Sequence, residues 1–246
     1  MRRRSCVPPL AIALVLPALA CSPRGGRPDD RAGATSVKED AAARASAGAA
    51  AGPRIVVLGD SLTAGLGLPL KDAYPTLLQS RITDEGWNYT IVNAGVSADT
   101  SAGGLSRIDW ALDGDVRVLI LALGANDGLR GLPPAELAGN LSAIVERAQR
   151  RGIAVILAGM EAPPNFGRQY TDEFHGVYTA LARKYKVPLI PFLLAGVAGI
   201  ASLNQPDGVH PTAEGARIVA GNVWTVLKPV LVAESRRADR GRAPGS

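Results

Sequence analysis

Residues that bind transition metals are scarce in this sequence. Its 246 residues contain two cysteines, Cys6 and Cys21, and two histidines, His175 and His210. A zinc site usually takes three or four ligands from cysteine, histidine and acidic side chains, so this supply argues against a protein-bound transition metal. We therefore expect no metal and no other cofactor. A chain that is 47% hydrophobic can instead build one packed core of ordinary domain size.

Several enzyme motifs are also missing. There is no Gly-x-Ser-x-Gly, which marks the nucleophile of α/β-hydrolases, and no Ser-x-x-Lys, which marks the nucleophile of β-lactamases. A Gly-x-x-x-x-Gly-Lys phosphate-binding loop does not occur either. The chain therefore lacks the sequence signatures of these serine hydrolases and of P-loop nucleotide-binding proteins.

Positive charge is in excess only near the two ends of the chain. The formal net charge is +5, yet residues 53–232 contain 15 basic and 16 acidic side chains. Residues 1–52 carry a charge of +4, and residues 233–246 carry +2. Binding to nucleic acid depends on basic side chains that neutralise phosphates, so the sequence predicts no nucleic-acid partner.

The first twenty residues have the pattern of an export signal. Three arginines precede an apolar stretch at 7–19, which is too short for an ordinary membrane-spanning helix. The stretch ends in Ala18-Leu19-Ala20, a small-residue cleavage site for signal peptidase. The same residues followed by Cys21 resemble a bacterial lipobox, although Ala18 and Leu19 depart from its usual pattern. Both interpretations place the cleavage after Ala20, so we expect residues 1–20 to be a signal peptide.

Cys21 bears on the choice between two forms of exported protein. After cleavage it would be the only cysteine left, and an unpaired thiol on an exported protein needs an explanation, which lipidation supplies. We therefore expect a periplasmic or cell-envelope lipoprotein attached to the membrane through Cys21, with a soluble secreted protein as the alternative.

Two segments outside the main body are predicted to be flexible. Residues 21–52 are rich in Ala, Gly, Ser, Arg and Asp and lack an apolar period, which predicts a flexible linker. Such a linker has an r.m.s. span of about 30 Å. Residues 233–246 have a similar polar composition and are predicted to be a disordered tail.

Strands and helices alternate along residues 53–232. Short runs of β-branched and aliphatic residues predict five strands, at 54–59, 89–93, 116–123, 153–157 and 188–191. Segments with apolar residues at helical spacing predict five helices, at 73–85, 105–112, 133–152, 174–185 and 212–227. This alternation indicates an α/β domain with a parallel sheet, and functional sites in such sheets form at the carboxyl ends of the strands.

Four short motifs fall at those strand ends or just before the last helix. They are Gly59-Asp60-Ser61-Leu62, Asn93-Ala94-Gly95, Gly124-Ala125-Asn126-Asp127 and Asp207-Gly208-Val209-His210-Pro211. Each motif is weak when taken singly, because the serine could be a helix N-cap and the other residues could belong to turns. Their joint placement at one edge of the sheet indicates a functional site instead.

With these motifs the chain resembles the SGNH, or GDSL, hydrolases over residues 54–230. The four marker residues of that family correspond, in order, to Ser61, Gly95, Asn126 and His210. The resemblance implies a three-layer, flavodoxin-like α/β fold with a parallel five-stranded sheet. It also makes residues 53–232 the hydrolase domain.

A particular branch of the family is indicated by two further stretches. Residues 128–133 and 159–167 look like the periplasmic esterases that have acyl-CoA thioesterase, lysophospholipase and arylesterase activity. One departure is Ala125, where that branch often has glycine, and this change removes no functional group.

The motif residues are of the types that acyl transfer requires. A serine hydroxyl is a weak nucleophile that needs an adjacent base, and we expect His210 to take the proton of Ser61. Asp207, three residues before the histidine, would orient the imidazole and stabilise its protonated form. The negative oxygen that develops on the substrate needs hydrogen-bond donors. We assign these donors to the backbone N–H groups of Ser61 and Gly95 and to the side-chain amide of Asn126.

The expected function is a serine esterase that hydrolyses carboxylic esters or thioesters of acyl or aryl substrates. A carbohydrate O-deacetylase of the same fold is an alternative enzyme. A surface lipoprotein that binds lipids without catalysis is an alternative of a different class. His175 lies in a predicted helix with no evident acidic partner, and we expect it to have a surface or packing role rather than a catalytic one.

The anchoring hypothesis makes a prediction for the exported protein. When the chain is expressed in a bacterium with its own signal, it should fractionate with the membranes. Cys21→Ser should release the protein or block its processing, because the modified thiol is the attachment point. Cell fractionation and mass spectrometry of the mature N-terminus check this, and a wild type that is cleaved, soluble and free of lipid would support the secreted alternative.

Overall fold

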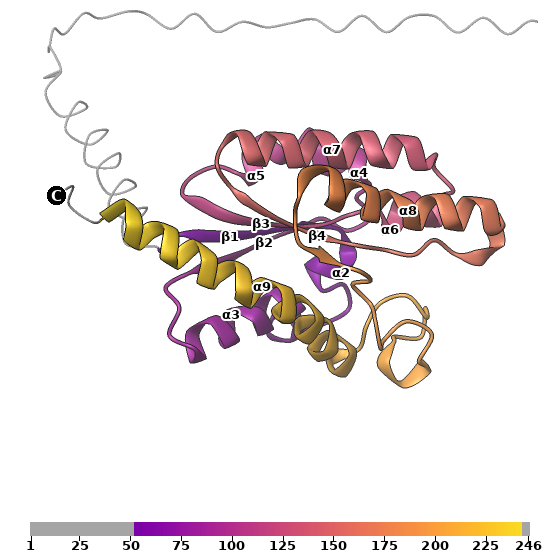
Figure 1. Cartoon of the computed structure of the whole chain (residues 1–246). Helices are drawn as coiled ribbons and strands as arrows, with labels where there is room; N and C mark the ends of the chain where they lie inside the picture. Colours follow the sequence, from indigo (N-terminus) through magenta and orange to yellow (C-terminus); the bar gives the residue numbers. More distant parts are fainter. Residues whose placement is uncertain (1–51, 243–246) are drawn as a thin grey trace, which may run out of the picture. The chain divides into compact units, whose positions relative to one another are not determined.

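The computed structural model describes residues 52–242 (Figure 1). The predicted signal peptide, Cys21 and nearly all of the predicted linker at 21–52 lie outside the described residues, as do residues 243–246. Within them, strands alternate with helices as the sequence predicts.

Five parallel strands form one sheet in the order β2-β1-β3-β4-β5. The strands are β1 (Arg54–Gly59), β2 (Thr90–Gly95), β3 (Val116–Ala122), β4 (Ala154–Ala158) and β5 (Leu189–Ile190). Residues 55–58 of β1 and 118–121 of β3 are fully buried, because helices cover both faces of the sheet at its centre. The predicted α/β class and the parallel five-stranded sheet are confirmed.

Helices on the two faces of the sheet complete three layers (Figure 1). One face carries α4 (Ser101–Ser106), α5 (Ile108–Ala111), α7 (Pro134–Arg150) and α8 (Arg168–Tyr185). The other face carries α3 (Tyr74–Asp84) and α9 (Ala213–Arg242). Two short helices, α2 (Ser61–Ala64) and α6 (Ala125–Leu129), begin just after the ends of β1 and β3. Single 3-10 turns lie at Leu70–Asp72, Pro164–Phe166 and Ala201–Leu203.

The longest helix on the first face, α7, shows how its sequence leads to its packing. Pro134 lies in the first turn, where the N–H that proline lacks would have no partner within the helix. Buried side chains then recur every three or four residues and form one apolar face, made of Leu137, Leu141, Ile144, Val145 and Ala148.

The predicted single helix at 105–112 is in fact two short helices, α4 and α5. Arg107 separates them, with a φ of −113° that is outside the helical range. Two consecutive glycines, Gly103 and Gly104, lie in α4 where they weaken helix propensity. Contacts with α7 hold α4 in place despite its two glycines. The apolar pattern alone therefore did not predict this helix.

The last helix, α9, extends further than the sequence predicted. It continues from Ala213 to Arg242, past the expected end near residue 227 and into the segment expected to be disordered, so that expectation is corrected for residues 233–242. Leu231 is fully buried beyond Pro229, which keeps the helix on the domain, and the following residues are mostly good helix formers. The segment Ala213–Arg237 is long and apolar enough to cross a membrane, but α9 packs on α3, β4 and β5.

Candidate active site

Ser61 is the first residue of α2 and follows the buried strand β1. The helix begins there because Oδ1 of Asp60 accepts the N–H of Leu62 at 3.0 Å, as an N-cap does. The turn before it requires Gly59, because a Cβ at this position would lie 2.0 Å from Oγ1 of Thr63. The strand end and this tight turn present the serine at the carboxyl edge of the sheet.

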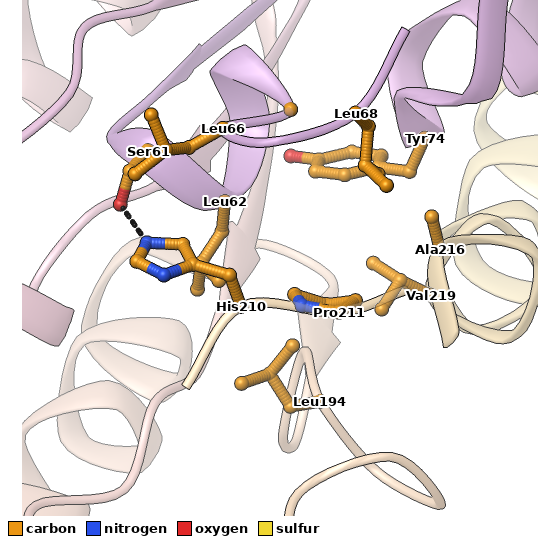
Figure 2. A pocket seen from close by; sticks show the side chains of 11 residues that line it. Ser61, Leu62, Leu66, Leu68, Tyr74, Leu194, His210, Pro211, Ala216 and Val219 are labelled. Atoms are coloured by element: carbon orange, nitrogen blue, oxygen red, sulfur yellow. Dashed lines mark hydrogen bonds between the residues drawn. The ribbon is translucent and has the colours of Figure 1, made fainter. Parts of the chain in front are cut away.

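The structure brings Ser61, His210 and Asp207 together. Nε2 of His210 lies 2.8 Å from Oγ of Ser61, and Nδ1 of the same ring lies 2.7 Å from Oδ2 of Asp207 (Figure 2 draws the first contact). Oδ1 of Asp207 accepts the N–H groups of Val209 and His210 at 2.9 and 3.0 Å. Hydrogen bonds from the backbone N–H groups of His210 and Val209 and then from the His210 ring lower the pKa of Asp207 to about 2. This carboxylate is therefore charged at any ordinary pH.

The loop that carries His210 is tied to the segment after Ser61 by Gln205. Nε2 of Gln205 donates to the carbonyl oxygens of Leu66 and Pro211 at 2.8 and 2.9 Å. The Gln205 N–H also donates to the His210 carbonyl oxygen at 2.7 Å. Sequence reasoning missed Gln205, because its partner Leu66 is 139 residues away and no motif links them.

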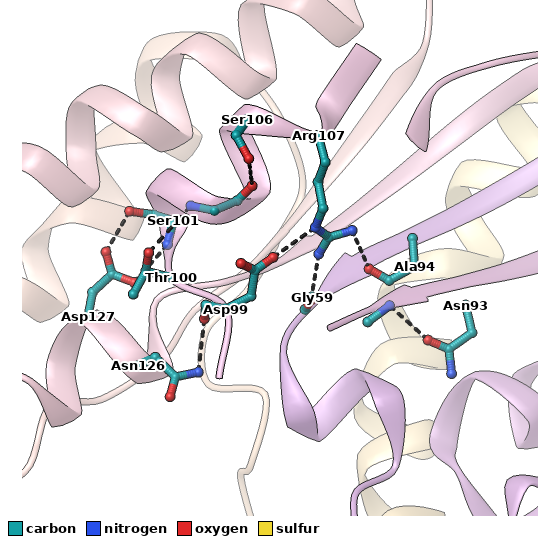
Figure 3. Close-up of polar contacts among 12 residues, drawn as sticks. Gly59, Asn93, Ala94, Asp99, Thr100, Ser101, Ser106, Arg107, Asn126 and Asp127 are labelled. Atoms are coloured by element: carbon teal, nitrogen blue, oxygen red, sulfur yellow. Dashed lines mark hydrogen bonds and ion pairs between the residues drawn. The ribbon is translucent and has the colours of Figure 1, made fainter. Parts of the chain in front are cut away.

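Gly95 is the last residue of β2, and Asn126 lies in α6 just after β3; these two strands flank β1 on either side. Only glycine fits at position 95, since a Cβ there would lie 2.3 Å from the backbone nitrogen of Ala64. The Gly95 N–H donates to Oδ1 of Asn93 at 3.0 Å, and Nδ2 of Asn126 donates to the carbonyl oxygen of Asp99 at 2.9 Å (Figure 3). An amide nitrogen has two hydrogens, so Asn126 keeps a second donor for a ligand.

Asp127, next to Asn126, is a buried acid that the sequence interpretation passed over as part of a turn. Its two carboxylate oxygens accept the N–H and the hydroxyl of Ser101 at 2.8 and 2.5 Å. The Ser101 hydroxyl also accepts Nδ2 of Asn140 at 3.0 Å. These bonds join α4, α6 and α7 and hold the turn that carries Asn126, and Figure 3 shows the contact of Ser101 with Asp127. The available signal was an acid a few residues after a buried apolar strand, since β3 ends at Ala122.

Asp60 is a second buried acid, directly before Ser61. The residue is 1% exposed, and its Oδ2 has no hydrogen-bond partner within the described part of the chain. Burial disfavours the charged carboxylate and raises the pKa of Asp60 to about 6, although the N–H of Leu62 and the charge of His210 act in the opposite direction.

An apolar groove lies beside the Ser61–His210 pair. The pocket directly at the pair is lined by Ser61 and His210 among others but holds only about 10 Å³, no more than one water (Figure 2). The adjacent groove holds about 350 Å³, within the range of small-molecule sites. Its lining is mostly apolar and includes Leu62, Leu129, Met160, Pro163, Phe192 and Val209.

His175 lies away from the triad on α8, as expected for a surface residue. Its Nδ1 is 2.7 Å from Oε1 of Glu161, and both side chains are largely exposed. The acidic partner, which the sequence did not reveal, comes from the loop after β4.

Comparison with known proteins identifies the family. Residues 57–218 match the model of the GDSL-like Lipase/Acylhydrolase family. The chain belongs to this family. The resemblance to SGNH hydrolases that the motifs indicated is thereby confirmed.

Individual relatives come from the expected branch of the family. The esterase TesA of Pseudomonas aeruginosa is 44% identical over 183 residues, which cover 74% of this chain and 91% of the relative. Thioesterase 1/protease 1/lysophospholipase L1 of Escherichia coli is 33% identical over 184 residues, which cover 74% of this chain and 87% of the relative. The crystal structure of AlinE4, an SGNH-hydrolase family esterase, is 44% identical with a TM-score of 0.61, covering 79% of this chain and 98% of that chain.

The raised pKa of Asp60 predicts a pH-dependent gain in stability for Asp60→Asn. Because folding raises this pKa, the cost of the buried charge is absent below about pH 4 and complete above about pH 6. The rise of the Asp60 pKa from the usual aspartate value to about 6 corresponds to about 3 kcal/mol at pH 8. Asparagine keeps the acceptor for Leu62 and has no charge, so the free energy of unfolding of the variant, relative to wild type, should increase from pH 4 to pH 8.

Urea unfolding at the two pH values measures this difference. The exposed Asp113→Asn is the control and should show no comparable change. A difference between Asp60→Asn and wild type that is the same at pH 4 and pH 8 would contradict a raised pKa of Asp60.

Proposed function

We propose that this protein is a serine hydrolase that cleaves carboxylic esters or thioesters. Ser61 acts as the nucleophile, His210 as the general base and then acid, and Asp207 as the group that orients the imidazole. The observation that carries the proposal is the pair of contacts at 2.8 Å from Ser61 to His210 and at 2.7 Å from His210 to Asp207. This is the arrangement that activates a serine hydroxyl for acyl transfer.

The positions of Ser61 and His210 account for each bond change and proton transfer in the proposed reaction. Oγ of Ser61 bonds to the carbonyl carbon of the substrate while its proton passes to Nε2 of His210. Collapse of the tetrahedral intermediate breaks the bond to the alcohol or thiol, which leaves with that proton. A water molecule then repeats the sequence on the acyl-enzyme and restores the serine. Asp207 remains ionised throughout, because its pKa is about 2.

The oxyanion formed in each step would be held by donors from three strand ends. These donors are the backbone N–H group of Ser61, the free hydrogen of the Asn126 side-chain amide and the backbone N–H group of Gly95. The Gly95 N–H would share its hydrogen between Oδ1 of Asn93 and the oxyanion. The three donors are supported by the common edge on which β1, β2 and β3 end and by the close approach of Gly95 to α2. Donors of this kind, aimed at developing charge, stabilise the transition state more than the bound substrate.

The groove beside the triad supports acyl or aryl groups as the part of the substrate that is recognised. Its lining is almost wholly apolar and shares Leu62 with the pocket at Ser61, so a chain bonded to the reacting carbonyl can enter it directly. Among the residues that the structure describes, Glu161 is the one charged residue that lines it. A sugar would need many more polar partners, so the groove favours an esterase, thioesterase or lysophospholipase over a carbohydrate O-deacetylase. The names of the relatives agree with this class.

We place this hydrolase outside the cytoplasm, attached to a membrane through Cys21. The basic n-region, the short apolar stretch and the position of the cysteine support this placement. A linker of about 30 residues would let the domain reach ester substrates near the membrane surface.

Removing the nucleophile tests the proposed function directly. Ser61→Ala should abolish hydrolysis of p-nitrophenyl butyrate and leave the melting temperature close to that of wild type. A fluorophosphonate should label Ser61 of the wild type, which peptide mass spectrometry detects. His210→Ala should lose most activity, whereas His175→Ala, the matched histidine control, should lose little. Labelling of another serine, or a wild type inactive on esters and thioesters, would refute the assignment.

Filling the groove tests its role in substrate choice. Ala198 lines the groove and is exposed, so Ala198→Trp should narrow it without disturbing the core. We expect kcat/KM for p-nitrophenyl dodecanoate to fall at least tenfold, while kcat/KM for the acetate ester changes less than threefold. Ala195→Trp places the same side chain on an exposed position outside the groove lining and should change neither. Equal losses for both ester lengths would place the acyl chain elsewhere.

A further inference from the structure

The segments that carry the three proposed oxyanion donors are held by one side chain. Arg107 lies between α4 and α5, and its guanidinium donates in three directions (Figure 3). Nη2 donates to the carbonyl oxygen of Gly59 at 2.9 Å, and Nη1 donates to the carbonyl oxygen of Ala94 at 2.8 Å. Nε contacts Oδ2 of Asp99 at 2.8 Å. The first two acceptors are the ends of β1 and β2, which lead into Ser61 and Gly95.

The contact with Ala94 acts on an oxyanion donor through a single peptide group. The carbonyl of Ala94 and the N–H of Gly95 belong to the same planar unit, so fixing the oxygen also fixes the direction of the N–H. A charged donor on the carbonyl also polarises the unit and makes its N–H a stronger donor. Arg107 thus sets both the aim and the strength of the Gly95 N–H.

The contact with Asp99 extends the same control to Asn126. The carboxylate of Asp99 accepts Nε of Arg107, while its backbone carbonyl accepts Nδ2 of Asn126 at 2.9 Å. That bond occupies one amide hydrogen of Asn126 and so determines where the second hydrogen points. The orientation of Asn126 therefore depends on where Arg107 holds the Asp99 loop.

We propose that Arg107 is a positioning residue for the hydrolysis reaction, which aligns the oxyanion donors from β1, β2 and the segment after β3. The inference rests on the function proposed above. In the described part of the chain, the polar contacts of Arg107 are with the carbonyl oxygens of Gly59 and Ala94 and with the carboxylate of Asp99, and none is with a proposed oxyanion donor itself.

The surroundings of Arg107 explain why this residue is an arginine. The side chains of Arg107 and Asp99 are 18% and 14% exposed, so the pair is largely removed from water. Such a pair is costly to desolvate and contributes little net stability, which suggests that it serves another purpose. A guanidinium donates from three nitrogens in a fixed plane, whereas a lysine ammonium is a single point charge. A lysine could not hold three acceptors in these directions.

Arg107→Met and Arg107→Lys test the proposal by separating kcat from KM. Both variants should lower kcat for p-nitrophenyl butyrate by about 10–100-fold and change KM less than threefold, because misaligned donors weaken transition-state stabilisation. A trifluoromethyl alkyl ketone forms a tetrahedral adduct on an active serine, and its inhibition constant should rise by a similar factor. The matched alkyl ether has no carbonyl, and its binding should not change.

Arg147→Met is the control for a loss that is merely structural. Arg147 on α7 donates Nη1 to Oδ2 of Asp109 at 3.0 Å, so its removal loosens α5 without affecting a strand end. It should change the melting temperature alone. If Arg107→Met does not fold, Arg107→Lys and Asp99→Asn carry the same test, with Asp99→Asn also expected to lower kcat selectively.

Three outcomes separate the failure of this inference from the failure of the proposed function. An active wild type together with folded Arg107 variants of normal kcat and normal ketone affinity would overturn the role of Arg107 alone. Equal changes in ketone and ether affinity would also overturn it, since they indicate a general distortion of the groove. A wild type without ester or thioester hydrolysis would instead overturn the proposed function.

Discussion

The parallel pairing of β1 with both β2 and β3 is the constraint on which the site depends. Its register places Gly59 beside Gly95 on one side and Ala122 on the other, so three strands end at one level. Ser61 and Asn126 follow β1 and β3 after short turns, on the same edge of the sheet as Gly95. A shift of this register would separate the three proposed oxyanion donors, and the fully buried side chains of β1 and β3 oppose such a shift.

Several locally destabilising features lie at this carboxyl edge of the sheet. The carboxyl group of Asp60 is buried with one oxygen unpaired, and glycine is required at positions 59 and 95 where other residues would stabilise a strand. Unfavourable groups of this kind collect where chemistry occurs and are held in place by the rest of the fold. Here the surrounding support comes from the packed sheet and from the hydrogen bonds of Asp127 with Ser101.

Much of the fold and of the triad could be predicted because their signals are local. The apolar runs of β1 and β3 and the spacing of Asp207 and His210 are each contained within a few residues. Arg107 gave no such signal, because the carbonyl groups to which it donates hydrogen bonds are 48 and 13 residues away in the sequence. The division of α4 from α5 and the continuation of α9 depended on tertiary contacts, which outweigh propensity and cannot be read from a short window. Gln205 could not be predicted for the same reason, because its partner Leu66 is distant in the sequence.

The position of Val209 links the apolar groove to His210, the proposed general base. This residue lines the apolar groove and directly precedes His210 in the chain, within the turn that Asp207 closes. Under the proposed function, an acyl chain in the groove would pack against the backbone that holds the imidazole and would favour the conformation in which Nε2 of His210 meets Oγ of Ser61. By linkage, part of the binding free energy of a distant methylene would then improve the alignment of the base and not only tighten binding. The length of the acyl chain would thus act on turnover as well as on affinity.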